Sequence, residues 1–510
     1  MRSTEGRAVR KLSLGHWKSL WWGVTLLAWG LALAGPAGAK SERYTFIISD
    51  THFGVGRDKN GVWDAYEDAR WPEDLASFLK YVATTGGGKA DLIINGDVFE
   101  LWQSRGVPCK YSDKDAGCSD ADALRRFRNV VSAHAEEIKM LKTFASSDEN
   151  KLTLIVGNHD VALLLPSVKA ELVSLFGCPA CKFSFEDSGV WQSDDGKVRA
   201  EHGHEIGKDL NAFDGWPRPF LQLEGKIHVR RPWGEQFVQE FYNQFEEKYP
   251  TIDNVTDELK AMRLGLGAEG TKGSAKGALE FLKFLALRES WEQVTHLLGG
   301  DGGVGSPWDV AAERAKGDTF LKSSFPTNDV AQQLLQGVKD AETDAFVRDP
   351  ARLSDMEIRG ICDARSSRKA SGLPVSLCDH PLGNLINSAV SNRTATFRTY
   401  LGSMKKRPRV FVYSHTHQAE RFNLTNPDVE VLNTGAWQRL VSPSGIDERA
   451  RASGKKPEEI LRLLRPEDLA ACYAFVVIPP YGGATPKAEL RSWRVDKTRP
   501  HGESSPKLCN

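Results

Sequence analysis

Short apolar runs recur along the chain, and each of them ends in a cluster of Asp, Asn or His residues. Five runs of this kind lie at residues 44–48, 91–94, 151–156, 198–200 and 409–413. Such runs, bounded by turn-forming residues, are typical of buried strands. Longer amphipathic segments, typical of helices, lie between them at residues 74–82 and 122–144. The alternation predicts an α/β fold in which layered central β-sheets are flanked by helices.

The pattern changes between residues 206 and 406, where strand-like runs are few. Helix-like segments appear instead, for example at residues 277–293 and 329–345. A segment of roughly 200 residues is far longer than an ordinary connecting loop. We therefore predict a large, mainly helical insertion or cap at residues 206–406, which divides a core formed by residues 40–205 and 407–510. Strand-like runs resume in the second part of this core, at residues 429–433, 473–478 and 488–495.

The first 39 residues have the three parts of a secretory signal. Five basic residues precede a mostly apolar run at residues 20–34, and a small-x-small site follows at Ala37-Gly38-Ala39. This order is typical of a cleavable signal peptide, and it predicts a periplasmic or secreted protein. The alternative is an uncleaved membrane anchor, because the apolar run is close to the shortest length that spans a bilayer. An anchor would keep the protein next to a membrane.

The chain contains eight cysteines. An even number of cysteines in an exported protein predicts disulfides. Proximity in the sequence favours the pairs Cys109 with Cys118, Cys178 with Cys181, and Cys362 with Cys378, which leaves Cys472 and Cys509 for each other. Eight cysteines permit about a hundred pairings, so the sequence alone leaves the connectivity open.

The charge balance argues against a general affinity for nucleic acid. Lys and Arg number 67 in the chain, as do Asp and Glu, but residues 1–39 hold five of the basic residues and one of the acidic ones. The chain without this segment is therefore slightly acidic. Such a balance gives no general electrostatic attraction to DNA or RNA, although a local basic groove is still compatible with it.

Five polar motifs follow the predicted strands. They are Asp50-Thr-His52, Gly96-Asp97, Gly157-Asn158-His159-Asp160, His202-Gly-His204 and His415-Thr-His417. A single motif of this kind is weak evidence, because a lone His or Asp is usually a structural or solvated group. Five of them at strand ends concentrate carboxylates and imidazoles in one place, and buried groups of this kind need a compensating charge. Metal ions would supply it.

The order of the motifs resembles that of the calcineurin-like metallophosphoesterases, whose pattern is D-x-H, GD, GNH-[DE], H and G-H-x-H. The resemblance covers about residues 44–206 and 408–440. It implies a site with two metal ions, one of them bound by Asp50, His52 and His417. It further implies that Asn158, His202 and His415 bind the second ion and that Asp97 bridges the two.

The ligand types narrow the identity of the metals. Mixed imidazole and carboxylate ligands suit Mn, Fe or Zn better than Ca or Mg. Two such ions close together are typical of enzymes that hydrolyse phosphate esters. His159 adjoins a predicted ligand without being one itself, so it is the candidate to protonate the leaving oxygen.

Two acidic residues are candidates to orient His159. The resemblance favours Glu100, three residues after Asp97, and Asp160 is the competitor; either could instead cap the start of a helix. His204 also has two interpretations, one as a residue that supports the site or contacts substrate, the other as a metal ligand in place of His202. The family pattern favours His202.

The chain departs from the family pattern at two places. Ser414 stands where the family usually has glycine before the last histidine pair. The segment 96–102, Gly-Asp-Val-Phe-Glu-Leu-Trp, lacks the arginine that follows the GD motif in protein serine/threonine phosphatases, which argues against a phosphoprotein substrate. This segment resembles that of the UDP-diacylglucosamine hydrolases, but those enzymes carry arginine at the position of His159.

We therefore predict an exported phosphoesterase with two metal ions, which hydrolyses a phosphomonoester or phosphodiester of a small phosphorylated substrate. The alternatives are a nuclease of the same superfamily, a protein that binds metal or phosphate without turnover, and a scaffold that uses the helical region for protein contacts. The complete set of predicted ligands together with His159 favours catalysis.

Overall fold

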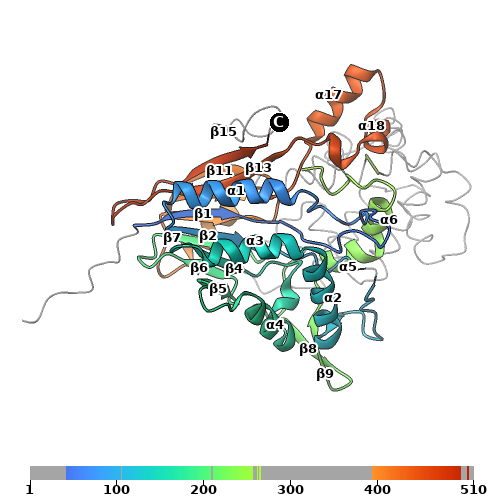
Figure 1. Cartoon of the computed structure of the whole chain (residues 1–510), viewed down its shortest axis with the longest axis horizontal. Coiled ribbons are helices and arrows are strands. Elements are labelled where there is room, and N and C mark those ends of the chain that lie inside the picture. Colours follow the sequence, from blue (N-terminus) through green and yellow to red (C-terminus); the bar gives the residue numbers. More distant parts are fainter. Residues whose placement is uncertain are drawn as a thin grey trace, which may run out of the picture. The chain divides into compact units, whose positions relative to one another are not determined.

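The computed structural model has a mixed α/β fold (Figure 1). The residues it describes are 42–104, 106–207, 211–256, 261, 264–265, 393–495 and 502–504. Within these ranges the chain forms three β-sheets and nine α-helices. The fold class predicted from the apolar runs is confirmed at this level. The predicted signal at residues 1–39 and most of the predicted helical insertion lie outside the described residues.

The largest sheet has seven strands in the order β15-β14-β13-β1-β2-β4-β5. Four of them are mutually parallel neighbours, namely β1 (Tyr44–Ile48), β2 (Ala90–Asn95), β4 (Lys151–Ile155) and β5 (Phe183–Glu186). The others come from the end of the chain and run antiparallel to their neighbours, namely β13 (Cys472–Ile478), β14 (Glu489–Arg494) and β15 (Gly502–Ser504). The parallel strands therefore end at one edge of this sheet.

The second sheet has five strands in the order β11-β12-β10-β7-β6. It joins β6 (Val190–Gln192) and β7 (Val198–Glu201) to β10 (Val410–Tyr413), β11 (Glu420–Thr425) and β12 (Asp428–Asn433). The strands β7, β10 and β12 are parallel. Because β7 pairs directly with β10, segments about 200 residues apart in the sequence form one sheet.

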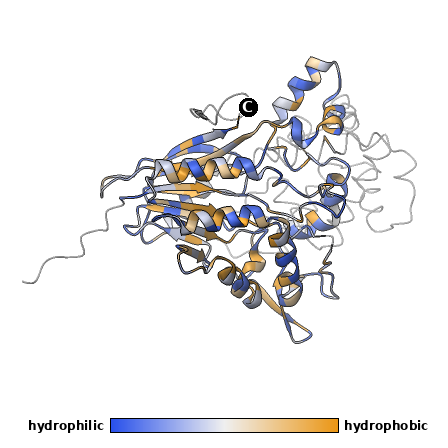
Figure 2. Cartoon of the chain, in the orientation of Figure 1, coloured by the Kyte–Doolittle hydropathy of each residue, from blue (hydrophilic) through white to orange (hydrophobic). Residues whose placement is uncertain are grey.

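The two sheets pack face to face. In β1, Ile47 belongs to a buried cluster that also contains Val198 and Val412 of the second sheet. Its neighbours Phe46 and Ile48 point to the opposite face, where they join the largest apolar cluster. This alternation follows from the two-residue period of a strand. Figure 2 shows the central strands as largely apolar, as expected for strands that are covered on both faces.

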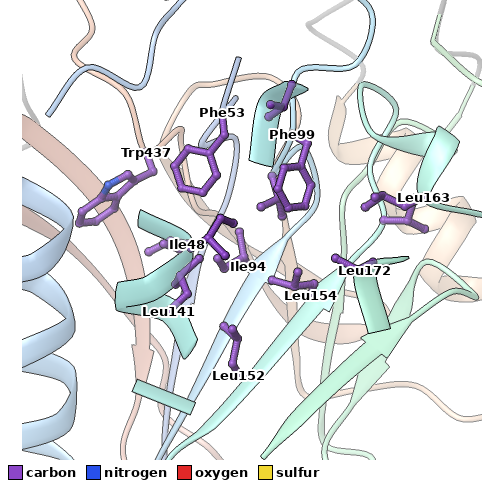
Figure 3. Close-up of a cluster of buried hydrophobic side chains, with 14 of the residues drawn as sticks. Ile48, Phe53, Ile94, Phe99, Leu141, Leu152, Leu154, Leu163, Leu172 and Trp437 are labelled. Carbon is purple, nitrogen blue, oxygen red and sulfur yellow. The ribbon is translucent and has the colours of Figure 1, made fainter. Parts of the chain in front are cut away.

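Helices cover the outer face of each sheet. The outer face of the larger sheet packs against α1 (Pro72–Thr85), α2 (Asp120–Ala133), α3 (Ala135–Ser146) and α4 (Pro166–Phe176). Figure 3 shows Leu141 of α3 and Leu172 of α4 beside the strand residues Ile94 and Leu154. Burying one such side chain contributes about 1.5–3 kcal/mol. The outer face of the five-stranded sheet is covered by α16 (Arg393–Gly402).

One predicted helix is wrong. The segment 122–144 was expected to be a single helix, but α2 ends at Ala133 and α3 begins at Ala135. Between them His134 has a non-helical backbone, with φ −107° and ψ 33°. Its ring is buried, with Nε2 3.2 Å from Glu67 and Nδ1 3.1 Å from Glu137. The contact with Glu67, which lies on a distant loop, accounts for the break, and no local pattern of the sequence indicates it.

The beginning of the predicted helical insertion contains strands. A third sheet of the described chain pairs β9 (Lys226–Arg230) with β8 (Phe220–Leu223) and with β3 (Ala116–Ser119) of the preceding core. The turn of this hairpin is Glu224-Gly225, with φ 51° and 72°. A two-residue turn in which both residues have positive φ matches the twist of a hairpin. The predicted helices at 277–293 and 329–345 lie outside the described residues.

Short helices follow this hairpin. They are α5 (Trp233–Phe237), a π-helix (Val238–Tyr242) and α6 (Asn243–Glu246). Tyr242 and Phe245 share a buried cluster with Ile446 of α17 (Pro443–Ser453) and Ile460 of α18 (Pro457–Leu463). The start of the predicted insertion therefore packs against the second part of the core.

Two of the four predicted disulfides are present. Cys109 is bonded to Cys118, and Cys178 is bonded to Cys181. Cys472 is also disulfide-bonded, but its predicted partner Cys509 lies outside the described residues, as does the predicted pair of Cys362 and Cys378. Disulfides are typical of oxidising compartments. In the part of the chain that the structure describes, no helix has both the length and the apolar character needed to cross a membrane.

Candidate metal centre

The polar motifs meet at the carboxyl ends of parallel strands from both sheets. Asp50 and His52 follow β1, Asp97 follows β2, and Asn158 follows β4. On the second sheet His202 follows β7, while His415 and His417 follow β10. We call these residues the strand-edge cluster; its members are Asp50, His52, Asp97, Asn158, His202, His415 and His417.

Most residues of the strand-edge cluster have a strained backbone conformation. Among the described residues, seven other than glycine have positive φ, and five of them belong to the strand-edge cluster. Their φ angles are 51° for Asp50, 43° for His52, 50° for Asp97, 72° for His415 and 55° for His417. Such conformations cost about 1–3 kcal/mol each and concentrate at functional sites. The surrounding sheets therefore hold the cluster at the expense of stability.

Two glycines make room for the cluster. A Cβ atom on Gly96 would lie 2.3 Å from Nδ1 of His202, and one on Gly157 would lie 2.2 Å from a carboxylate oxygen of Asp97. Gly96 also has a φ of 88°, which favours glycine. The glycines of the GD and GNHD motifs are thus required by close packing against cluster residues.

The ligand atoms gather in groups that could each hold a metal ion. One group is Asp50, His52 and His417, and another is Asp97, His202 and His415; within each group the donor atoms lie within 4.8 Å of one another. Asp97 belongs to the second group and also faces the first, since its Oδ2 is 3.0 Å from Nε2 of His202 and 3.8 Å from Nε2 of His52.

Asn158 adds an amide oxygen to the second group. Its Oδ1 lies 2.9 Å from Nε2 of His202. On the side of the first group, Oδ1 of Asp50 lies 3.4 Å from Nε2 of His417. The structure thus brings all seven predicted ligands to one strand edge. Their individual ligand roles stay predictions.

Asp50 provides the test of whether a cation fits. It is fully buried, yet neither carboxylate oxygen accepts a hydrogen bond. A buried ionised carboxylate without such partners is costly unless a cation lies beside it. Burial alone would raise the pKa of Asp50, but His202 and His417 hold it well below its usual value. The residues therefore fit a metal ion at this position.

The histidine rings are held in the way that metal ligands usually are. Nδ1 of His52 lies 3.1 Å from Oε2 of Glu100, and Nδ1 of His202 lies 2.8 Å from the backbone oxygen of Asn95. In both rings Nε2 faces the carboxylate of Asp97. Hydrogen bonds of this kind fix the ring orientation and the tautomer of histidine ligands. Burial would lower the pKa of His202, but Asp97 and Asp50 raise it to about 9.

Glu100 connects a predicted ligand to the predicted acid. Its Oε2 lies 3.1 Å from Nδ1 of His52 and 2.5 Å from Nδ1 of His159. Its Oε1 accepts the backbone N–H groups of Trp102 and Gln103. Burial would raise the pKa of Glu100, but the two histidines hold it well below its usual value. Glu100 is thus placed to orient both rings.

Asp160 has different partners. Its two oxygens accept the backbone N–H groups of Gly157, at 2.6 Å, and Val98, at 2.7 Å. Burial and the nearby Asp97 carboxylate raise the pKa of Asp160 to about 7. These hydrogen bonds tie the loop after β4 to the loop after β2. Asp160 therefore supports the backbone around Asp97, whereas Glu100 contacts the ring of His159.

His204 lies behind the cluster. Its ring meets that of Trp216 edge to face at 4.5 Å between centroids, and that of Phe213 at 5.8 Å. His202, in contrast, lies directly against Asp97 and Asn158. The geometry therefore places His202 as the ligand candidate and His204 as part of the wall that backs it.

Two neighbours of the site were not assigned a role from the sequence. Trp102 stacks on His159 with centroids 4.0 Å apart and an interplanar angle of 26°. Nδ2 of Asn211 lies 3.4 Å from Nε2 of His415. The only feature of the sequence that pointed to Trp102 was its position in the segment 96–102, after the GD motif. Asn211 follows no motif, so nothing in the sequence indicated the second.

No family model matches the chain, and no curated protein matches it either. The described residues combine α/β sheets with buried His and Asp groups that could bind metal, an arrangement compatible with a metallophosphoesterase. The strand-edge cluster is therefore the feature of this chain that indicates a function.

Proposed function

We propose that this protein is a phosphoesterase with a dinuclear metal centre, which hydrolyses a small phosphomonoester or phosphodiester outside the cytoplasm. The observation that carries the proposal is the strand-edge cluster, in which a fully buried Asp50 has no hydrogen bond to either oxygen. Groups of possible metal ligands lie on both sides of Asp97. This arrangement supports a pair of metal ions that share the Asp97 carboxylate.

The residues divide between two ions. Asp50, His52 and His417 would hold the first, and Asn158, His202 and His415 the second, with Asp97 shared. Mixed nitrogen and oxygen donors suit Mn, Fe or Zn. When bound, two such ions bind phosphate oxygens, lower the pKa of a water molecule and neutralise the charge that develops at phosphorus.

His159 would protonate the leaving oxygen. Its Nδ1 is occupied by Glu100, so Nε2 is the nitrogen left to meet a substrate. Its side chain is 19% exposed, whereas that of His202 is 0% exposed, so solvent and substrate reach it more readily. Trp102 and Glu100 together restrict the ring to one orientation. A fixed acid of this kind contributes about 10²- to 10⁴-fold to a rate.

The disulfides and the charge balance of the chain support a small substrate outside the cytoplasm. The disulfides Cys109–Cys118 and Cys178–Cys181 are typical of an oxidising compartment. The slightly acidic balance of the chain without residues 1–39 gives no general attraction to nucleic acid. We therefore place a small phosphate ester ahead of DNA or RNA as the substrate.

Hydrolysis of two synthetic esters tests this proposal. p-Nitrophenyl phosphate and bis-p-nitrophenyl phosphate are offered to the protein loaded with Mn²⁺, and the preferred ester separates a monoesterase from a diesterase. We expect Asp97→Asn and His159→Ala to lose turnover. His228→Ala, which removes another buried histidine on β9, should retain it. A metal-loaded protein inert toward both esters, or variants as active as the wild type, would contradict the proposal.

A DNA substrate in the same assay tests the alternative of a nuclease. Faster hydrolysis of DNA than of either synthetic ester would favour a nuclease. Strong salt dependence should accompany such an activity, because DNA binding is dominated by phosphate contacts.

A further inference from the structure

A chain of buried polar side chains lies directly behind the strand-edge cluster. It consists of Asn95, Ser414, Thr434 and Ser49, each of them 0–1% exposed. Nδ2 of Asn95 is 2.7 Å from Oγ of Ser414, which is 2.8 Å from Oγ1 of Thr434, which is 2.6 Å from Oγ of Ser49. These residues lie at the ends of β2, β10, β12 and β1. The chain therefore connects strand ends of both sheets.

The donors and acceptors in this chain run in one direction. Both N–H groups of the Asn95 amide are used, since Nδ2 donates to the backbone oxygen of Glu201 at 2.8 Å as well as to Ser414. The Ser414 hydroxyl accepts from Asn95, so its single hydrogen is free to go to Thr434. At the far end, Ser49 donates to the backbone oxygen of Gly435 at 2.8 Å. A flipped Asn95 amide would set two oxygens against each other at Glu201, which excludes that orientation.

Asn95 joins this chain to both histidines of the second metal group. Its side chain binds Glu201 and Ser414, which immediately precede His202 and His415. Its backbone oxygen accepts the Nδ1–H of His202 at 2.8 Å. The next residue, Gly96, packs so closely that a Cβ there would meet the His202 ring. Movement of the Asn95 side chain would thus displace the peptide that supports His202.

We infer that Ser414 and Asn95 are positioning residues for the metal ligands His202 and His415, and that the Ser414 hydroxyl sets the affinity for the second ion. The inference rests on the proposed function. It also accounts for the departure at Ser414, where the family that the motifs resemble usually has glycine. A glycine would remove the acceptor of one N–H of the fully buried Asn95 amide, and an unpaired buried donor is costly. Thr434 would lose one partner but keep its contact with Ser49.

Titration of the metal-free full chain with Mn²⁺ by calorimetry tests the inference. The wild type should bind two ions. Ser414→Ala should weaken one of the two binding steps by about 10- to 100-fold, the usual effect of removing a residue that supports a ligand, and leave the other step unchanged. Ser414→Thr keeps the hydroxyl and should restore the affinity. At saturating Mn²⁺, the Ser414→Ala protein should regain most of its turnover of p-nitrophenyl phosphate.

Two further variants separate positioning from general damage. Ser492→Ala removes another fully buried hydroxyl, on β14 and outside the chain of polar residues, and should leave both binding steps unchanged. Thr434→Val keeps the size of the side chain but removes the acceptor of Ser414, so it should weaken the same step as Ser414→Ala even if the latter is too unstable to measure. Wild-type affinities in folded Ser414→Ala or Thr434→Val would overturn the inference. A wild type that binds no Mn²⁺ would instead overturn the proposed function.

Discussion

Two buried groups of histidine and carboxylate side chains in this protein differ in the partners of their carboxylates. In the helix-break cluster, which consists of Glu67, His134 and Glu137, one ring lies between two carboxylates, with an oxygen within 3.2 Å of each nitrogen. Glu67 also accepts the backbone N–H groups of Gly56 and Ala69. In the strand-edge cluster, by contrast, Asp50 accepts no hydrogen bond at either oxygen.

The two clusters also differ in the conformation of their backbone. None of the three residues of the helix-break cluster has positive φ, whereas five of the seven residues of the strand-edge cluster do. The first cluster is a structural contact in which His134 lies between two carboxylates that raise its pKa. The second combines strain with unsatisfied acceptors, as expected where a ligand from outside completes the site. A buried histidine beside carboxylates is therefore not by itself a sign of a metal site.

The largest effect should come from breaking the strand-edge cluster at its shared carboxylate. Asp97→Asn removes the charge between the two donor groups, so we expect hydrolysis to fall by more than the roughly 100-fold typical of residues that only support a ligand. Ester hydrolysis together with the metal content of the variant checks this. An Asp97→Asn protein with two tightly bound ions and wild-type turnover would remove the bridging role.

Breaking the helix-break cluster should affect stability and not metal binding. His134→Ala leaves two carboxylates without their buried partner, which typically costs about 3–5 kcal/mol. Urea unfolding of the metal-loaded protein measures the loss, and Mn²⁺ titration of the same variant should give wild-type affinities. A change in metal affinity without a change in stability would show that the helix-break cluster contributes to metal binding and not to stability.

The helix-break cluster should also make stability depend on pH. Burial would lower the pKa of His134, but Glu137 and Glu67 raise it to about 9. Because the folded pKa exceeds the unfolded value of about 6.5, the contribution is fully present below pH 6.5 and is lost as the pH rises through 9, a change of about 3 kcal/mol. Unfolding of metal-loaded wild type and His134→Gln across this range measures it. Identical slopes for both proteins would refute this prediction.

The smallest effect is expected at Glu100, which supports the strand-edge cluster without being a predicted ligand. Glu100→Gln should reduce turnover by about 10- to 100-fold, because the neutral amide cannot serve two imidazole N–H groups and two backbone N–H groups at once. Since Glu100 contacts His52 as well as His159, this variant should also weaken one metal-binding step. His159→Ala should leave both steps unchanged. Equal metal affinities in the two variants would show that the contact with His52 is unimportant.

The sequence predicted much of the fold because strand signals in this chain are local. Apolar runs such as residues 44–48 and 151–156 carry their own period and their own turn residues, so β1 and β4 lie where they were expected. The break at His134 was missed because it depends on Glu67, a residue remote in the sequence. The hairpin of β8 and β9 was missed although its Glu224-Gly225 turn gives a local signal.

The candidate site was predictable to the extent that its residues follow strands. Order along the chain placed Asp50, Asp97 and His202 at strand ends, and the parallel strands then bring such residues to one edge. The order of residues along the chain does not, however, predict which side chains contact one another. The link from Asn95 to Ser414 spans more than 300 positions, and the stacking of Trp102 on His159 depends on how two loops meet.

The metal content of the purified protein shows directly whether the strand-edge cluster is a metal centre. Elemental analysis for Mn, Fe and Zn gives the number of ions per chain, with His134→Gln as a variant that alters the other histidine cluster. We expect two ions per chain in the wild type and in His134→Gln, and loss of both after treatment with a chelator. A folded wild-type chain that holds no transition metal, and takes up none when Mn²⁺, Fe²⁺ or Zn²⁺ is supplied, would show that the strand-edge cluster is not a metal centre.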